Sequence, residues 1–128
     1  MLLSPSNTGK RIAVFNTGDE VRNLAVTPGK GVQTAWAGSF NGLVYHFDAD
    51  GKLLQYRNAG SAVTALAALP DGGAVAGTVQ GAVIRFAADG SILSRAQLNG
   101  QITEIVRTGD RFAAVSAKGD VAIFAALP

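Results

Sequence analysis

The 128-residue chain contains no cysteine, which excludes disulfides, thiolate metal sites and a cysteine nucleophile. Charged residues are scarce at 16%, the formal net charge is only +2, and Lys10-Arg11 is the only adjacent basic pair. A nucleic-acid interface needs clustered basic residues, so we expect no nucleic-acid partner. No run approaches the roughly 18 uninterrupted apolar residues of a membrane helix, so we expect no membrane partner either.

The first ten residues, MLLSPSNTGK, lack the basic start and the apolar run of a secretory signal. The sequence therefore predicts a cytoplasmic protein. An exported mature form, from which a leader has been removed, stays open as the alternative.

What the chain does have is an internal repeat. Residues 42–54, GLVYHFDADGKLL, recur 39 positions later as residues 81–93, GAVIRFAADGSIL. A partial third copy follows at a shift of 38, in which GAVIRF at 81–86 becomes GDVAIF at 119–124. A repeat of this period is the mark of an architecture built from one supersecondary unit used several times.

Each unit contains four strand-like runs. In the second unit they are residues 62–69, 74–79, 82–87 and 91–98, separated by the turn sequences PDGG, QG and ADG. Glycine adopts positive φ without a steric penalty and aspartate bonds its own following backbone, so these sequences favour tight turns. Four short antiparallel strands in about 40 residues are typical of a β-propeller blade. We therefore predict an all-β propeller.

The pattern that ends the first two units, hydrophobic-Phe-x-Ala-Asp-Gly-x-hydrophobic-Leu, resembles the WD40-like and quinoprotein-like (PQQ-type) propeller repeats. The resemblance covers about residues 10–128 and implies that the aromatic residue closes the third strand of each blade. The Trp-Asp pair of true WD40 repeats is absent: Phe47-Asp48 is its nearest analogue and Phe86-Ala87 has lost the acid. The tryptophan-docking residues of cofactor-binding quinoproteins have no identifiable counterpart, and we expect no cofactor.

With strands named a to d outward from the propeller axis, the chain reads d–abcd–abcd–abc, which totals three blades. The outer strand comes first, because KRIAVFNTGDEVRNL at 10–24 aligns without a gap with KLLQYRNAGSAVTAL at 52–66. The predicted organisation is a tail at 1–9 and a single domain at 10–128, divided into an outer strand (10–20), a blade (21–61), a second blade (62–100) and a partial blade lacking its outer strand (101–128).

Three blades are fewer than the usual four to eight of a closed propeller. We predict a homodimer that closes as a six-bladed ring, in which the d strand of each subunit completes the partial blade of the other. A heteromeric ring with another propeller fragment, or a larger parent protein of which this is a piece, are the alternatives.

No catalytic or metal-binding residue is predicted. Residues 48–51, DADG, resemble the opening of a calcium loop, but the glutamate required at its twelfth position would fall on Ala59, so we interpret them as a hairpin turn. His46 is the only histidine, and its repeat counterparts are Arg85 and Ile123, so we interpret it as packed or solvated.

The single tryptophan, Trp36, aligns with Val75 and Ala113, which predicts a place in the core between blades. Phe40 is different, because its counterparts are Val79 and Ala117 and it stands at a loop tip beside Asn41. An exposed aromatic residue with polar neighbours is typical of an interface anchor.

In propellers the d–a and b–c connections lie together around one opening of the axis, which we call the funnel face, and partners usually dock there. We therefore predict a non-enzymatic protein-binding or scaffold module, whose partners are itself and another protein. The predicted binding residues are Asp19, Glu20, Phe40, Asn41, Gln80, Asn99, Gln101 and Lys118.

The alternative is a small-ligand-binding or enzymatic propeller that uses its axial channel. Candidates near the a strands are Arg22, Thr64 and Glu104. A fragment or designed repeat with no function beyond folding is a third hypothesis, and the unequal residues at 36, 75 and 113 argue against it.

Overall fold

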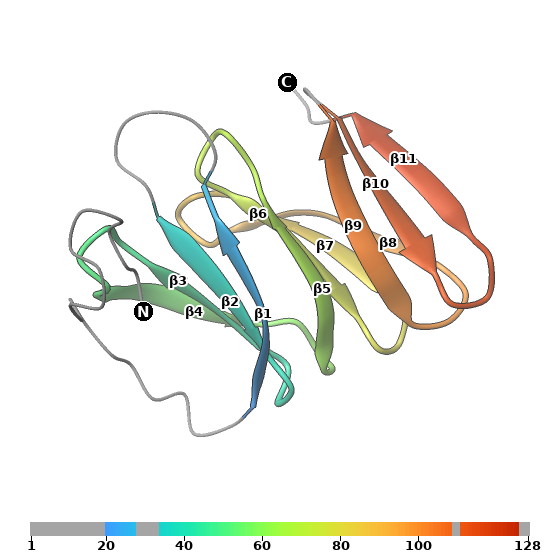
Figure 1. The fold of residues 1–128 in the computed structure, drawn as a ribbon, viewed down its shortest axis with the longest axis horizontal. Coiled ribbons are helices and arrows are strands. Elements are labelled where there is room, and N and C mark those ends of the chain that lie inside the picture. The colour runs from blue at the N-terminus through green and yellow to red at the C-terminus, as the bar shows by residue number, and fades with distance from the viewer. Residues whose placement is uncertain (1–19, 28–33, 109–110, 126–128) are drawn as a thin grey trace, which may run out of the picture.

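The computed structural model describes residues 20–27, 34–108 and 111–125. These residues form three antiparallel sheets, which we call the first, second and third blade (Figure 1). The first blade has the strand order β1 (Val21–Val26), β2 (Ala35–Ser39), β3 (Leu43–Phe47) and β4 (Leu53–Asn58). The second has β5 (Val63–Ala68), β6 (Ala74–Thr78), β7 (Ala82–Phe86) and β8 (Ile92–Gln97), and the third has β9 (Ile102–Thr108), β10 (Arg111–Ser116) and β11 (Val121–Ala125). The all-β fold class with four-stranded blades is confirmed.

The turn between the second and third strands is built in the same way in all three blades. A hydroxyl at the end of the second strand accepts the N–H of a residue two positions on (Ser39) or four positions on (Thr78 and Ser116), at 3.1–3.3 Å. A glycine with φ of 92–96° completes each turn, at Gly42, Gly81 and Gly119. A residue with a Cβ is strained at this φ, so the repeated glycines in the sequence fix where these hairpins turn.

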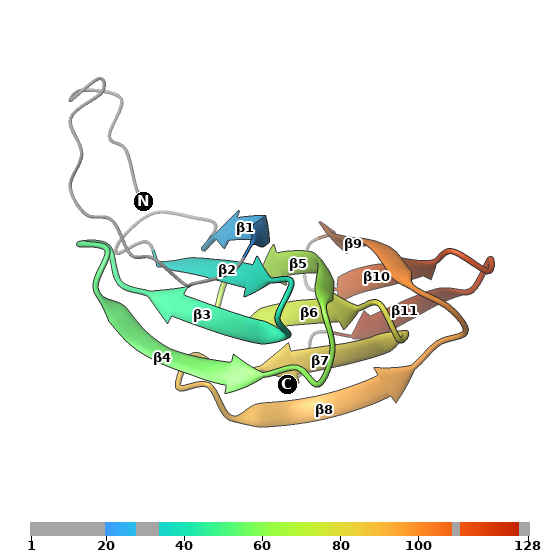
Figure 2. The same ribbon diagram turned by 90° about the horizontal axis from the view of Figure 1, so that it is seen from below.

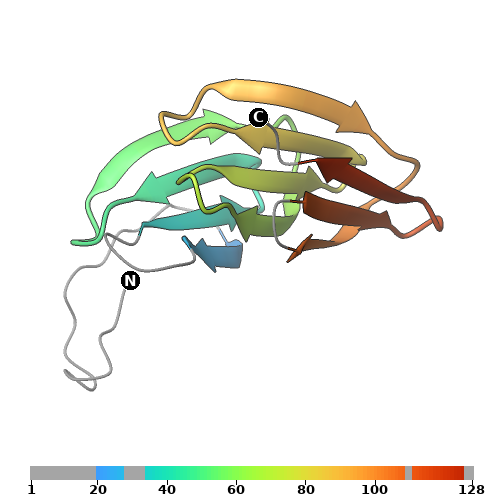
Figure 3. The same ribbon diagram turned by 90° about the horizontal axis from the view of Figure 1, so that it is seen from above.

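The first strands of the three blades, β1, β5 and β9, lie side by side on one side of the molecule (Figures 2 and 3). The outer strands β4 and β8 lie on the opposite side. Side chains tie the inner strands together: the Asn23 amide donates to the Val63 carbonyl oxygen at 3.0 Å, and the Thr64 hydroxyl donates to the Ile102 carbonyl oxygen. The blades therefore fan out from a shared inner edge.

The hydrophobic core lies in the joints, by which we mean the packed interfaces between neighbouring blades. Trp36 and Val44 of the first blade pack with Ile84 and Phe86 of the second, and all four side chains are fully buried. The second joint is built in the same way, from Val75 and Val83 of the second blade and Ile102, Ile105 and Phe112 of the third. Burying one such side chain contributes about 1.5–3 kcal/mol, so face-to-face packing of blades is what stabilises this fold.

The outward face of the third blade has no neighbour among the described residues. Val121 and Ile123 on β11 are 65% and 69% exposed, and Val106 on β9 is 43% exposed. β11 is also an edge strand of its sheet in the described part of the chain. The outer strand predicted at residues 10–17 lies outside the described residues, so strand exchange between subunits stays a prediction.

Candidate functional site at the funnel face

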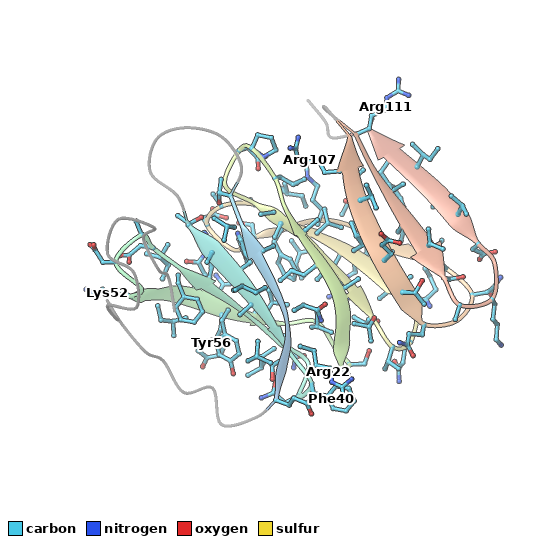
Figure 4. The ribbon with its side chains drawn as sticks, in the orientation of Figure 1. Arg22, Phe40, Lys52, Tyr56, Arg107 and Arg111 are labelled. Carbon is cyan, nitrogen blue, oxygen red and sulfur yellow. The ribbon has the colours of Figure 1, made fainter. Side chains whose placement is uncertain are left out.

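Two side chains that sequence reasoning assigned to different sites lie together at one end of the inner strands. Arg22, a candidate for the axial channel, is the second residue of β1, and Phe40, a candidate interface anchor, follows β2 (Figure 4). The Arg22 guanidinium carbon lies 4.8 Å from the centre of the Phe40 ring, which is the geometry of a cation–π contact. Arg107 and Arg111 lie at the opposite end of the blades, away from this pair (Figure 4).

Glu20 holds this pair in place. Its carboxylate oxygen Oε2 lies 2.7 Å from Arg22 Nε, and its backbone carbonyl accepts the Phe40 N–H at 2.8 Å. The Ser39 hydroxyl also donates to that carbonyl, at 3.2 Å. Phe40 nonetheless remains 46% exposed. The ring is therefore presented to solvent on a loop that two hydrogen bonds tie to the Glu20 carbonyl.

A cavity of about 340 Å³ opens beside Phe40. It is lined by Arg22, Asn23, Phe40, Thr64, Val79 and Gln101. It thus joins residues of the predicted funnel face to residues of the predicted axial channel. Sequence reasoning missed Asn23 and Val79 as lining residues, although Val79 was visible as the repeat counterpart of Phe40.

Among the other predicted funnel residues, Asn41 uses its side chain in a turn, whereas Asn99, Gln80 and Gln101 use backbone groups. The side-chain oxygen of Asn41 accepts the Leu43 N–H at 3.0 Å, which shapes the turn after Phe40. The Asn99 backbone N–H donates to an Asp120 carboxylate oxygen at 2.9 Å. The Gln80 and Gln101 carbonyls accept the Gln97 side-chain amide and the Ala117 N–H, at 2.6 and 2.8 Å. Lys118 is exposed, and Asp19 lies outside the described residues.

The axial-channel candidates do not converge as a catalytic set. The Thr64 hydroxyl is already used by the Ile102 carbonyl, so it is a link between inner strands. Glu104 is exposed, pairs in register with Val115 and does not line the cavity. Among the described residues there is no group of three histidine, cysteine, aspartate or glutamate side chains that could hold a metal ion. The same residues contain no helix that is long and apolar enough to span a membrane.

His46 lies in the joint between the first and second blades, away from the funnel face. It is 2% exposed and stacks on Trp36, with 3.9 Å between the ring centres. The Gln55 amide nitrogen lies 3.1 Å from Nδ1, which must therefore accept, so Nε2 carries the proton and donates to the Thr34 hydroxyl at 3.0 Å. Burial lowers the pKa of His46, so this imidazole is a neutral packing group.

The turn at residues 48–51 is also structural. One carboxylate oxygen of Asp48 accepts the N–H groups of Asp50 and Lys52, each at 2.9 Å. This carboxylate closes the hairpin between β3 and β4, as interpreted from the sequence.

No protein-family model matches the chain, and no curated protein matches it by sequence. Solved structures do match. A BamB structure from Moraxella catarrhalis superposes with a TM-score of 0.61 at 24% identity, over 72% of this chain and 28% of that one. Sqt1 from Saccharomyces cerevisiae gives a TM-score of 0.71 at 18% identity, over 84% and 32%. BBS1N, in a complex with ARL6DN, gives 0.66 at 16% identity, over 80% and 35%.

The fold is that of a β-propeller. The three matched structures are β-propeller or WD40-like proteins, and the antiparallel four-stranded sheets described above are propeller blades. The likeness shows the fold alone, because sequence identity is below 25% in every case. The chain spans about a third of the length of each matched propeller.

Proposed function

We propose that this chain is a non-enzymatic protein-binding module and that it recognises its partner at the funnel face. The observation that carries the proposal is the Phe40–Arg22 pair at the rim of the 340 Å³ cavity. Aromatic and arginine side chains are enriched among the residues that dominate binding energy at protein interfaces. Propellers in general serve as interaction scaffolds, which agrees with this role.

The fixed position of the Phe40 loop supports the proposal. A side chain that is already ordered loses less conformational entropy when a partner binds, so more of its buried area contributes to affinity. A partner could cover the exposed part of Phe40 and insert one side chain into the adjoining cavity, whose lining offers both apolar atoms (Val79) and polar groups (Asn23, Gln101).

The alternative of a small-ligand-binding or enzymatic propeller is less well supported. Arg22 is the only channel candidate that both lines the cavity and carries a charge, and its guanidinium is already paired with Glu20. A thermal-shift screen with a metabolite library separates the two functions: a specific stabilisation by several degrees supports the channel, and the absence of any hit supports protein binding.

The module belongs to a closed ring in this proposal, since unpaired blades leave apolar faces in water. Homodimerisation into six blades is the ring predicted from the sequence. A ring completed by other blades serves the funnel-face function equally well.

The test compares the amount of binding partner that the Phe40→Ala and Lys118→Glu variants capture with the amount that the wild type captures. Both variants change exposed side chains, so we expect unchanged thermal stability and a large loss of captured partner. Leu93→Ala is the matched control, because Leu93 is 53% exposed on β8 and does not line the cavity. Equal capture by the wild type and both funnel-face variants would remove this face from consideration.

A further inference from the structure

Both joints of the described structure depend on a glycine in the second strand. A Cβ added to Gly38 would lie 2.5 Å from Cγ1 and 3.0 Å from Cβ of Val63, the first residue of β5 in the next blade. A Cβ added to Gly77 would lie 2.7 Å from Cβ of Ile102, the first residue of β9, and closer still to Ile102 Cγ2. Neither glycine has a positive φ, so each is required by the close approach of the next blade.

The strand registers identify the same position in the third blade. Gly38 pairs with Asn23, and Gly77 pairs with Ala65. Each pair comes directly after the β-bulge that follows the first residue of the inner strand. In the third blade the residue in this register is Val115, which pairs with Glu104. Here the glycine of the first two blades is replaced by a β-branched residue.

Val115 belongs to the face of the third blade that has no neighbour. Along β10 the residues buried against the second blade, Phe112 and Ala114, alternate with half-exposed ones, and Val115 is among the half-exposed. Val106, Val121 and Ile123 are the large exposed apolar residues on β9 and β11. This outward face is apolar enough to be a joint but differs in shape from the other two.

A second copy of the chain does not fit this face by the joint geometry seen in the structure. The residue equivalent to Val63 and Ile102 in the first blade is Val21, which starts β1 in the same register. In a two-chain ring Val21 of one copy would meet Val115 of the other, where even a bare Cβ leaves too little space. The side chain two residues before Val115 in β10 is also smaller than its equivalents in the other blades, because Ala113 stands where the first blade has Trp36 and the second has Val75.

Polarity at this joint differs as well. In the first joint the Asn23 amide donates to the Val63 carbonyl across the blades. Glu104 occupies the register of Asn23 in the third blade, and an ionised carboxylate can only accept hydrogen bonds. The Val21 carbonyl of a second copy is another acceptor; Thr103, at the position of Thr64, can donate to it, but it offers no donor to the Glu104 carboxylate.

We propose that the outward face of β9, β10 and β11 docks a further propeller blade that carries glycine or alanine at the position of Val63 and Ile102, and a hydrogen-bond donor opposite Glu104. A second copy of this chain is therefore not its native neighbour. The small residue leaves room for Val115, and the donor pairs the Glu104 carboxylate.

Sedimentation analysis of the wild type and three variants tests this proposal. Val115→Gly restores the residue that the first two blades have, and Val21→Gly turns the first blade into one with the proposed small residue. We expect a 13.1 kDa monomer for the wild type and a species of about twice that mass for either variant, with self-association tightened at least about tenfold. Val121→Gly is the matched control: it removes the same atoms from the same face, at the cross-strand partner of Val115 and not at the glycine position itself, and should not strengthen association.

Thermal unfolding of each variant verifies that it is folded before its mass is compared. A wild-type dimer that Val115→Gly and Val21→Gly do not tighten would overturn the proposal. The proposal also fails if both variants remain as monomeric as the wild type, since the Val21–Val115 contact would then not be what decides association.

Discussion

Replacing Gly38 by alanine tests whether the close approach of neighbouring blades is real. The added methyl group would lie 2.5 Å from Cγ1 and 3.0 Å from Cβ of Val63, which is fully buried. Rotation of the valine side chain relieves the first contact but not the second, because Cβ moves only with the backbone of β5. The two blades must therefore separate slightly at their inner edge.

The size of the effect follows from two opposing terms. Overpacking a well-packed core costs about 1–3 kcal/mol. Replacing glycine by alanine also restricts the unfolded chain, which stabilises the fold by about 0.4–1 kcal/mol at a compatible φ. We expect a net loss of about 1–2 kcal/mol in the free energy of unfolding, or about 4–7 °C in Tm for a chain of this length.

A double-mutant cycle with Val63→Ala makes the reasoning refutable. Val63→Ala alone should cost about 2–3 kcal/mol through lost burial and a small cavity. In that background no Cγ1 has to move aside, but the 3.0 Å contact with Cβ remains, so the Gly38→Ala cost should fall below its wild-type value without vanishing. Denaturant titrations followed by circular dichroism and by Trp36 fluorescence supply the four free energies. An equal cost of Gly38→Ala in both backgrounds, or a stabilisation in the wild type, would refute the close-approach argument.

Two further predictions concern the joint between the first and second blades. Because burial holds the pKa of His46 below its ordinary value of 6.5, the unfolded chain takes up a proton below about pH 6.5 that the folded chain does not. Stability should therefore fall as the pH is lowered from about 7 to 5.5, and His46→Phe, which keeps an aromatic ring on Trp36, should flatten this decline in denaturant midpoints. Trp36→Ala should cost about 3–5 kcal/mol, since the fully buried indole stacks on His46 and donates to the Gly72 carbonyl at 3.1 Å. Trp36→Phe should cost clearly less in thermal melts followed by circular dichroism, and equal costs would show that ring packing is not what Trp36 contributes.

The blade architecture was predictable from the sequence because its signals are local. The strand predicted at 82–87 is observed as Ala82–Phe86, and the one predicted at 91–98 as Ile92–Gln97. Glycine and aspartate determine turns through their own backbone preferences, so a turn needs no knowledge of the rest of the chain. The 39-residue period then repeats the same local solution in the next blade.

The candidate site was only partly predictable, because its contacts join residues that are far apart in sequence. Phe40 stood out as an odd aromatic residue at a loop tip, but its contact with Arg22 depends on how β1 pairs with β2. Thr64 had the position of a channel residue, yet its hydroxyl is used by a carbonyl 38 residues away. The need for glycine at position 38 also lies far along the chain, in the Val63 side chain of another blade.

The joints differ in a way that specifies the order of the blades. The second strand presents tryptophan and glycine to the first joint, valine and glycine to the second, and alanine and valine to the outward face of the third blade. If all three faces were alike, any blade could follow any other, and the two ends of a three-blade chain would pair with each other or polymerise. A bulky residue at the glycine position raises the free energy of that pairing without weakening the joints already made. Val115 therefore lowers the affinity of the chain for itself and keeps its exposed face for a blade of different shape.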